Sequence, residues 1–405
     1  MGTGERFFGE IVAAVPFCVI AGFQGKVEPV VNHSSYDFLI VGLGAMGSSA
    51  AYHLAQRGAR VLGLDRFTPP HSSGSSHGQT RIIREAYFEH PDYVPLIQRA
   101  YELWADLACA AGEELLLPTG GLMIGPPGGV VVSGARRSAE AHNLPHEVLT
   151  AEEVSRRFPG LCPEGDMLAV FEPRAGILFP ERCVAANLRL AAERGATLGF
   201  DEPVLHWEAD GDGVRVVTSR GEYLASQLVL TAGSWINSLL PGLHLPFTVE
   251  RQVQFWFAPT PARDVFHPDR CPVHLWQFDH DRFFYGFPDL GKGVKVACHH
   301  RGERVDPDTL RPEVGPEEIE VMRGILCRFL PTANDRLIDA VVCKYTMTPD
   351  EHFWLDRHPQ HPRVLIVSPC SGHGFKFSAV IGEVVADLLT SGRSRFDLSL
   401  FRHRS

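Results

Sequence analysis

The sequence of 405 residues lacks any long basic run, and its formal net charge is −10 at pH 7. Nucleic-acid-binding surfaces need clustered positive charge, so this composition argues against a nucleic acid as partner. Internal repeats and low-complexity tracts are also absent. Because 44% of the residues are hydrophobic, the chain can bury a full core, and its length corresponds to two or three domains.

Cysteine occurs at nine positions, but never as C-x-x-C and never at regular spacing. An odd number of irregularly spaced cysteines does not indicate a disulfide framework. No group of residues has the spacing that a zinc site requires. We therefore expect mostly reduced, buried thiols, a cytoplasmic location and no bound metal.

The N-terminal part contains an apolar run at Ile11–Phe23 that is too short to cross a membrane as a helix. Only Arg6 is basic before this run, and no A-x-A cleavage site follows it, as a signal peptide would require. Three interpretations stay open for residues 1–35: a packed extension, an export signal, or translated sequence upstream of the true start. We expect a non-essential extension and no membrane association.

A strand, a glycine-rich loop, a helix and a second strand are predicted between Tyr36 and Asp65. The apolar residues 38–41 indicate a buried parallel strand, residues 50–56 a helix, and residues 61–64 a strand that ends at Asp65. This order of elements, with an acid about 20 residues after the glycines, is typical of a dinucleotide-binding unit.

The glycines of this unit have G-x-G-x-x-G spacing and separate roles. Gly42 permits a tight turn, Gly44 lets the backbone approach a pyrophosphate, and Gly47 lets the helix pack closely against the strand. The helix N-terminus supplies free N–H groups for the phosphates, and Asp65 is placed to accept hydrogen bonds from a ribose. The sequence therefore predicts a dinucleotide site.

The segment after this unit, residues 69–78, is small and polar, which predicts a loop. It leads to Arg81 and Arg84, which would share one face if residues 80–84 formed a helical turn. A solvated surface pair is the usual explanation of two such arginines. Their position directly after a nucleotide loop favours a ligand site.

The rest of the chain alternates between helical and extended patterns. Helices are expected at 93–111, 151–158, 185–194, 316–329 and 379–389, and strands at 122–124, 214–219, 228–232 and 364–367. Residues 245–296 are rich in strand formers and aromatics, which predicts a separate, largely antiparallel sheet whose aromatics roof a small apolar pocket.

These patterns are interleaved rather than placed end to end, and they predict an α/β fold with an α+β second domain. A Rossmann-like, discontinuous nucleotide-binding domain is expected to comprise residues 36–90, 165–244 and 340–395. An antiparallel-sheet substrate domain is expected to comprise residues 91–164 and 245–339.

Six motifs carry a resemblance to a known family. They are DFLIVGLGAMG, PPHSSGSSHGQTRIIREAYFEHPDYVPL, FYGFP, KVACH, CKYTMTPDEHFWLDRHP and SGHGFKFS. The sequence resembles the monomeric sarcosine oxidase family of flavoproteins, which includes N-methyltryptophan oxidase and L-pipecolate oxidase. The resemblance extends from Tyr36 to near the C-terminus.

The resemblance implies FAD as cofactor, held covalently to its 8α-methyl group through Cys343 in the C-x-Y-T context. On residue chemistry alone, Cys343 is one of nine cysteines and would be a buried structural thiol. The other cofactor-binding residues expected from the glycine motif and the resemblance are Gly42, Gly44, Gly47, Asp65, Arg66, Ser76, His77, Thr80, Gly372, Gly374, Phe375 and Lys376.

The resemblance also implies oxidation of a secondary amino acid at its N–C bond, with hydrolysis of the imine and reduction of O₂ to H₂O₂. Arg84 and Lys376 match the residues that bind the substrate carboxylate, a role that suits a bidentate arginine. Arg81 matches a residue over the flavin, and Lys295 matches the lysine that promotes the reaction with O₂. The expected partners are therefore a secondary amino acid and O₂, bound by a monomer.

Three further residues match the active-site pocket of the family: Tyr285, His299 and Tyr345. His300 lies beside His299, but alternation along a strand places His299 on the same face as Lys295. An unprotonated substrate amine needs no strong base, so we assign none to His299. Substrate contact, electrostatics at the flavin and modest proton transfer stay open as its role.

The chain departs from the family pattern at three positions. Pro369 and Cys370 precede the SGHGFKFS loop where the family has glycine and a bulky apolar residue. Trp276 falls where smaller or flexible residues line the family's pocket, and it would change the substrate if it points inward.

Sarcosine is the expected substrate, with pipecolate or a proline-like amino acid second. A biosynthetic oxidase that forms an imine from a larger amine is a further possibility within the family. Two functions of other classes also stay open, a nicotinamide-dependent dehydrogenase and a flavin-binding protein that does not use O₂.

Overall fold

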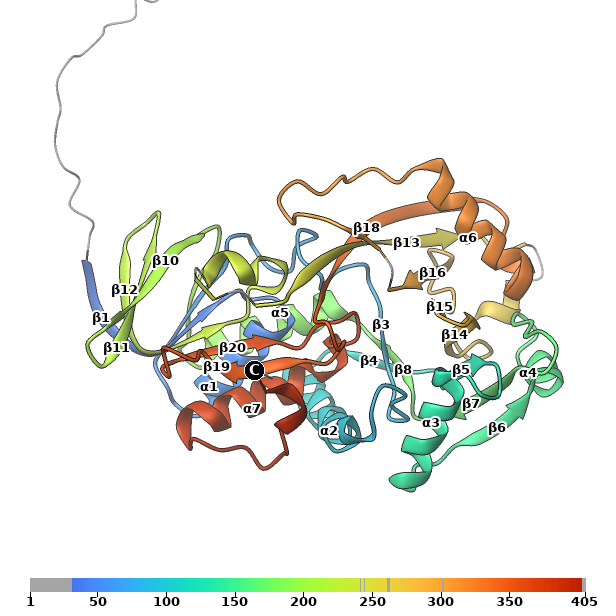
Figure 1. The fold of residues 1–405 in the computed structure, drawn as a ribbon, viewed down its shortest axis with the longest axis horizontal. Coiled ribbons are helices and arrows are strands. Elements are labelled where there is room, and N and C mark those ends of the chain that lie inside the picture. The colour runs from blue at the N-terminus through green and yellow to red at the C-terminus, as the bar shows by residue number, and fades with distance from the viewer. Residues whose placement is uncertain (1–30, 241, 244, 261–262, 301, 403–405) are drawn as a thin grey trace, which may run out of the picture.

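The computed structural model describes residues 31–240, 242–243, 245–260, 263–300 and 302–402. Within these residues the strands form sheets of eight, nine and three strands. The two large sheets occupy opposite ends of the long axis of the molecule (Figure 1). The apolar run at Ile11–Phe23, and with it the alternatives for the N-terminal segment, lies outside the described residues.

The first sheet contains the glycine-rich loop at its centre. Its strands are β1 (Val31–Val41), β2 (Val61–Leu64), β9 (Thr197–Gly199), β10 (Val204–Asp210), β11 (Gly213–Thr218), β12 (Glu222–Leu230), β19 (Trp354–Arg357) and β20 (Val364–Ser368). β1 pairs in parallel with β2 on one side and β12 on the other, and β12 pairs in parallel with β20. The apolar ends of these strands are buried on both faces, as in other covered parallel sheets.

Helices cover one face of the first sheet and form one hydrophobic cluster with it. They are α1 (Ala45–Gln56), α2 (Val94–Ala111), α5 (Pro180–Glu193) and α7 (Ser378–Thr390). α1 and α7 approach closely because Gly382 has no side chain, and a Cβ atom there would overlap Ser49 Oγ. A second cluster, which includes residues of the 3₁₀ segment Gly233–Leu239, covers the other face.

The second sheet is the predicted antiparallel sheet, with one parallel pair formed by β5 and β14. Its strands are β5 (Gly121–Gly125), β6 (Glu147–Thr150), β7 (Leu168–Glu172), β13 (Thr248–Phe257), β14 (Val273–Asp279), β15 (Arg282–Phe287), β16 (Val294–His299), β17 (Glu303–Arg304) and β18 (Leu337–Met347). One face packs against α6 (Pro316–Phe329), and α3 (Val130–Ala141) and α4 (Ala151–Arg157) lie near its β5–β7 end (Figure 1).

Trp276 points into the core of this second sheet, away from the first sheet. Its ring stacks on Phe284 with centroids 5.3 Å apart and also contacts Phe329 of α6. The indole Nε1 donates to His274 Nδ1 at 2.7 Å, and the side chain is fully buried. The prediction that Trp276 lines the substrate pocket is therefore wrong, because the neighbouring residue Leu275 has the inward-facing position on β14.

The segment around Arg81 and Arg84 is extended, and the predicted helical turn is wrong. β3 (Arg81–Ile83) pairs with β8 (Gly176–Leu178), which also pairs with β4 (Leu116–Pro118) to complete the small third sheet. The partner strand supplies the backbone hydrogen bonds that a helical turn would have formed within itself.

The two domains are interleaved, but their boundaries differ from the predicted ones. β7 and residues 340–347 of β18 belong to the second sheet, because their backbones pair with β5, β6 and β13. α2 packs on α5 and α7 of the first domain, since its apolar stripe faces these helices. The first sheet begins at Val31, five residues before the predicted boundary.

Two other local predictions, the cap of α4 and the bounds of α6, agree with the structure. Thr150 and Glu153 form the capping box at the start of α4, and α6 begins and ends at the predicted residues. In the part of the chain that the structure describes, no helix combines the length and apolar character needed to cross a membrane. The same residues contain no group of His, Cys, Asp and Glu arranged to hold a metal ion.

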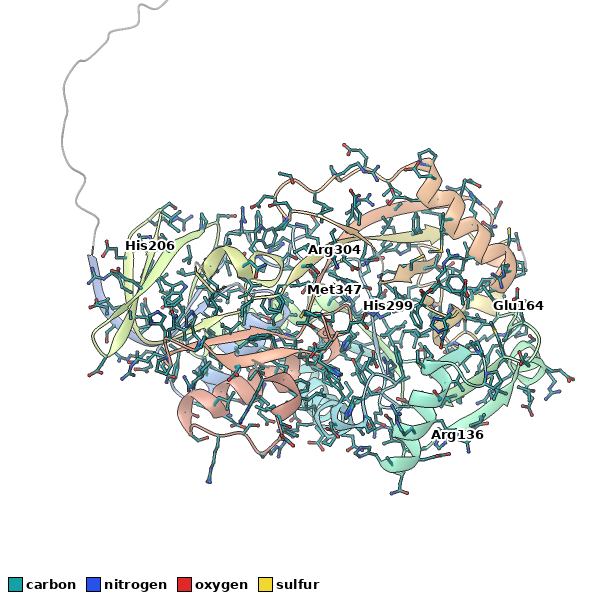
Figure 2. All side chains as sticks on the ribbon, in the orientation of Figure 1. Arg136, Glu164, His206, His299, Arg304 and Met347 are labelled. Atoms are coloured by element: carbon teal, nitrogen blue, oxygen red, sulfur yellow. The ribbon has the colours of Figure 1, made fainter. Side chains whose placement is uncertain are left out.

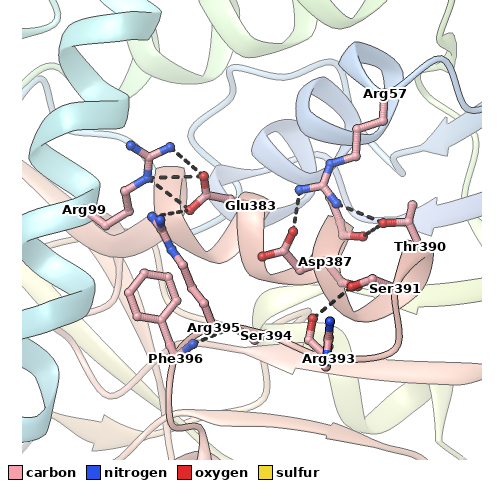
Figure 3. Close-up of polar contacts among 11 residues, drawn as sticks. Arg57, Arg99, Glu383, Asp387, Thr390, Ser391, Arg393, Ser394, Arg395 and Phe396 are labelled. Atoms are coloured by element: carbon pink, nitrogen blue, oxygen red, sulfur yellow. Dashed lines mark hydrogen bonds and ion pairs between the residues drawn. The ribbon is translucent and has the colours of Figure 1, made fainter.

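An ion-pair cluster anchors α7 to α1 and α2 (Figure 3). Arg99 of α2 donates to both carboxylate oxygens of Glu383, at distances between 2.6 and 3.2 Å, and Arg395 donates to the same carboxylate at 3.3 Å. Arg57 of α1 binds Asp387 at 2.6 Å. The Arg99 and Glu383 side chains are 24% and 14% exposed, so solvent screens this pair only in part.

We expect Glu383→Gln to lower the free energy of unfolding by about 1–2 kcal/mol, because Arg99 and Arg395 lose their charged acceptor. Urea denaturation of the FAD-loaded protein measures this difference. Glu140→Gln is the matched control, since its pair with Arg136 lies on the surface with both side chains more than half exposed (Figure 2). Equal losses in the two variants would show that the Glu383 cluster does not anchor α7.

Candidate functional site

A cavity of about 420 Å³ lies between the two large sheets. It begins at the glycine loop after β1 and extends past Asp65 and Ser76 to residues of β14, β15, β16 and β18. His299, one of its lining residues, lies near the middle of the molecule (Figure 2). Both domains therefore contribute to a single site.

The three motif glycines differ in what surrounds them. Gly42 has a φ of +94°, and a Cβ atom there would lie 2.6 Å from the Thr231 carbonyl oxygen. A Cβ atom at Gly47 would overlap the Gly42 carbonyl oxygen. At Gly44 a Cβ atom would meet only Ser76 Oγ, 3.9 Å away, and this residue lines the cavity. The fold itself therefore requires Gly42 and Gly47, whereas Gly44 leaves room for a ligand.

Asp65, at the end of β2, lies beside the glycine loop and lines the cavity. Its carboxylate accepts hydrogen bonds from the Leu43 N–H at 2.6 Å and the Phe67 N–H at 2.8 Å. Each carboxylate oxygen has a second lone pair, so Asp65 can fix the loop and still accept from a ribose hydroxyl. Arg66 also lines the cavity and lies 4.8 Å from the Trp235 ring.

The polar loop predicted at 69–78 forms one wall of the cavity, with Ser76 in the lining and His77 and Thr80 buried behind it. Lys295 of β16 reaches this loop from the second sheet. Its Nζ donates to Gly78 O at 2.6 Å, Thr80 Oγ1 at 3.0 Å and Thr80 O at 3.1 Å. Burial lowers the pKa of Lys295 well below its usual value, and the charge of Arg81 lowers it further.

Cys343 of β18 is buried beside the same loop. Its Sγ lies 3.9 Å from an Arg81 Nη and 3.9 Å from the Ser75 carbonyl oxygen. Burial alone would raise the pKa of Cys343, but a hydrogen bond with His77 and the positive charge of Arg81 lower it to about 7. His77 and Arg81 thus favour the thiolate form of Cys343, in contrast to a thiol buried among apolar groups.

Arg84 and Lys376 both line the cavity and lie close enough for their charges to interact. Arg84 donates to both oxygens of Glu89 at 2.7 Å and to the Ala86 carbonyl oxygen at 3.2 Å. Lys376 Nζ donates to the His373 carbonyl oxygen at 2.8 Å. Burial, together with the charge of Arg84, lowers the pKa of Lys376 to about 7.

Tyr285, Tyr345 and His299 line the cavity next to these cations. His299 Nδ1 lies 3.3 Å from the Tyr345 hydroxyl, and Tyr285 hydrogen-bonds to Tyr345. Burial raises the pKa of Tyr285 to about 12 and lowers the pKa of His299 well below its usual value. This part of the cavity wall is therefore neutral at physiological pH.

The SGHGFKFS loop follows β20 and closes the cavity on the side of the first sheet. Gly372, Gly374 and Phe375 line the cavity, as do the unusual residues Pro369 and Cys370. Burial raises the pKa of Cys370 to about 11, so its thiol stays protonated and unreactive at neutral pH.

Sequence reasoning did not single out several cavity residues. Glu89 follows Arg84 by five positions and carries the only carboxylate that pairs with it among the described residues. The Gln254 side chain is 2% exposed and lines the cavity, and its Oε1 has no protein partner in the described part of the chain. Alternation along β13 could have indicated Gln254, because Phe255 faces the core beside it.

The residues present fit FAD. Gly44 leaves space exactly where a pyrophosphate would approach the loop, and Asp65 retains free lone pairs for a ribose. His71 Nδ1 and Gln254 Oε1 are buried cavity-lining atoms without a partner among the described residues, as expected where a polar ligand completes the site. Tyr285 and His299 line the same cavity.

Comparisons with known proteins agree with this site. The chain matches the FAD dependent oxidoreductase family, DAO, over residues 37–388. It is 45% identical to a monomeric sarcosine oxidase of Streptomyces avermitilis, over 91% of this chain and 97% of that protein. It is 36% identical to an N-methyl-L-tryptophan oxidase of Yersinia pestis, over 90% of this chain and 98% of that protein.

Among solved structures, the open form of NikD, described as an unusual amino acid oxidase essential for nikkomycin biosynthesis, superimposes with a TM-score of 0.79. It is 26% identical, and the match covers 92% of this chain and 98% of that chain. L-proline dehydrogenase from P. horikoshii has the same TM-score at 21% identity, which shows a shared fold.

The family match extends through both domains, and its members are FAD-dependent. The nicotinamide-dependent dehydrogenase that the glycine motif left open is therefore wrong. The chain belongs to the sarcosine oxidase and N-methyltryptophan oxidase family of FAD-dependent oxidoreductases and is an oxidase that acts on CH–NH donors.

Proposed function

We propose that this oxidase acts on sarcosine or a closely related N-methyl amino acid and converts its N–C bond to an imine. The observation that carries the proposal is the buried pair of cations, Arg84 and Lys376, beside the neutral Tyr285–Tyr345 wall. The cations suit an amino-acid carboxylate, and the tyrosine rings suit a small apolar group on nitrogen. The 45% identity to a sarcosine oxidase supports the same substrate class.

The carboxylate is proposed to bind where Glu89 now accepts from Arg84. Arg84 is 2% exposed, so it needs a negatively charged acceptor at all times. Glu89 supplies that acceptor without substrate, and a substrate carboxylate shared with Lys376 can replace it. The exchange keeps the guanidinium paired throughout binding.

The substrate amine is proposed to bind unprotonated beside Tyr285 and His299. Both side chains are neutral at physiological pH, because burial raises the pKa of Tyr285 and lowers that of His299. A neutral wall without a carboxylate does not stabilise an ammonium group. Loss of the amine proton on binding leaves the nitrogen lone pair available, so no dedicated base is required.

FAD, which Gly44, Asp65 and the polar loop would hold, would supply the two-electron chemistry between the substrate and O₂, with H₂O₂ as the product. Lys295 and Arg81 are proposed to supply positive charge near the ring during these electron transfers. A preorganised cation stabilises the negative charge that develops on O₂. Cys343 is proposed to hold the cofactor covalently, because its lowered pKa makes it the reactive thiol of the site.

The remaining assignments are also proposals. Cyclic secondary amino acids such as pipecolate carry the same carboxylate and amine, so they rank second, and larger secondary amines rank third. We propose a cytoplasmic protein that is a monomer, and the similarity to monomeric sarcosine oxidases supports the monomer.

A peroxide-coupled screen tests the proposed substrate class. We expect the highest kcat/KM for sarcosine among sarcosine, N-methyltryptophan, pipecolate, proline and a secondary amine without a carboxylate. The last compound is the control for the Arg84–Lys376 pair and should give no turnover at matched concentration. A preference for the carboxylate-free amine would overturn the proposal.

Intact-mass analysis of the denatured protein tests the flavin linkage. The wild-type chain should carry the added mass of one FAD, whereas Cys343→Ser should release FAD on denaturation. Cys370→Ser is the control, since Cys370 lines the cavity and has a raised pKa. Retention of the adduct in Cys343→Ser would assign the linkage to another residue.

Lys295→Met should slow reoxidation of the reduced flavin by O₂ about 10²-fold or more, because a buried cation near the site of electron transfer is lost. Stopped-flow absorbance measures this rate separately from reduction by substrate. Lys292→Met is the control, since Lys292 is more exposed and pairs with Asp339 outside the cavity. Equal rates in wild type and Lys295→Met would remove Lys295 from this role.

A further inference from the structure

Glu172 is a buried acid that the proposed reaction does not use. It ends β7 in the second sheet, is 2% exposed, and does not line the cavity. Its two carboxylate oxygens accept hydrogen bonds from two successive backbone N–H groups, those of Glu85 and Ala86, each at 2.6 Å. These short, charge-assisted contacts clamp a segment that has left the regular pairing of β3.

The clamped segment directly follows Arg84. The Ala86 carbonyl oxygen accepts from Arg84 at 3.2 Å, so the residue held by Glu172 in turn holds the guanidinium. The same segment continues to Tyr87, whose ring lies 4.2 Å from the Arg84 guanidinium carbon, and to Glu89. A shift of residues 85–86 would therefore move the acceptors that orient Arg84.

Only an ionised carboxylate satisfies both N–H groups. A glutamine at this position would present one acceptor oxygen and one NH₂ group, and the NH₂ group would face a backbone donor. A protonated carboxyl group likewise loses part of its acceptor capacity. The clamp is thus complete in one ionisation state of Glu172.

We propose that Glu172 is a positioning residue that fixes the substrate-binding Arg84 from the second sheet by holding residues 85 and 86. This inference rests on the proposed function, since it assigns Arg84 to the substrate carboxylate. It predicts that the loss of the Glu172 charge weakens substrate binding without removing any group that contacts the substrate.

The charges around Glu172 set the pH at which the clamp opens. Burial raises the pKa of Glu172 to about 7, although the N–H groups of Ala86 and Glu85 oppose this shift. The carboxylate of Glu85 raises the pKa further, and Arg84 lowers it. From the other packed elements, Arg174 pairs with Glu85 at 2.9 Å, and Tyr101 of α2 stays neutral because burial raises its pKa.

Protonation of Glu172 should weaken substrate binding. Above pH 7 Glu172 is ionised and the clamp is closed, and as the pH falls through about 7 it takes up a proton and loses an acceptor. The KM for the substrate should therefore rise on the acid side. The partial neutralisation of Lys376, whose pKa is also about 7, acts on the alkaline side instead.

Steady-state kinetics of the FAD-loaded enzyme, with the best substrate of the screen, tests the proposal. Glu172→Gln should raise KM about ten-fold or more at pH 8, change kcat much less, and abolish the rise of KM below pH 7. Glu172→Asp keeps the charge and should retain the acid-side rise. Arg84→Ala gives the KM expected when the guanidinium is absent altogether.

Glu85→Gln is the matched control, because Glu85 is equally buried and adjacent but does not hold the backbone. Its KM at pH 8 should equal that of the wild type, and its acid-side rise should move to lower pH, since one negative charge beside Glu172 is gone. If Glu172→Gln does not fold, this displacement in Glu85→Gln still tests the proposal. An acid-side rise of KM that persists in Glu172→Gln, or that does not move in Glu85→Gln, would overturn the positioning role, whereas absence of turnover with every compound in the screen would instead overturn the proposed function.

Discussion

Removal of a guanidinium or ammonium group from water costs several kcal/mol unless protein acceptors replace the water. Arg84, Lys295 and Lys376 are each 2–6% exposed, and each obtains its acceptors in a different way. Glu89 neutralises Arg84, three oxygens of Gly78 and Thr80 surround the Lys295 ammonium, and one carbonyl oxygen binds Lys376. The arrangement of the surrounding loops follows from this need, because the acceptors must be present before any ligand arrives.

For Lys295 this compensation requires both domains. Lys295 projects from β16 of the second sheet, but its acceptors belong to the loop that follows β2 of the first sheet. Lys376 comes from the loop after β20, and the segment with Arg84 is clamped from β7. The interleaved chain order thus has a physical consequence, because separation of the domains would leave the buried Lys295 ammonium without acceptors. The two sheets are therefore coupled through this cation.

The sequence predicted the elements that local patterns determine and missed those that depend on pairing between distant segments. The glycine unit, α6 and the capping box at Thr150 follow from spacing within a few residues. The strand at Arg81–Ile83 depends on β8, almost a hundred positions later, and the membership of β18 depends on β13. Local spacing contains no information on either partner, so both were misassigned.

Among the site residues too, sequence motifs identified some members, and contacts between distant segments determined the others. Motifs placed Arg84, Lys295 and Lys376 around one cavity, and the structure has Arg84 and Lys376 in its lining, whereas Lys295 is buried behind the wall and bonded to Gly78 and Thr80. The direction of Trp276 required the register of β14, and a shift of one residue reverses the face. Glu89 lies within a family motif and Glu172 in none, but neither was singled out, because their importance lies in what they pair with in three dimensions.

The cysteines show most clearly how a three-dimensional environment selects one residue among chemically identical ones. Burial raises the pKa of the thiols at Cys162, Cys183, Cys271, Cys298 and Cys370. Cys343 is as deeply buried, yet its pKa falls to about 7, because His77 and Arg81 stabilise the thiolate. His77 belongs to the polar loop and Arg81 to β3, and Gly78 and Thr80, which lie between them, accept hydrogen bonds from Lys295. Among these thiols, only the surroundings of Cys343 favour the thiolate, which supports its proposed link to FAD.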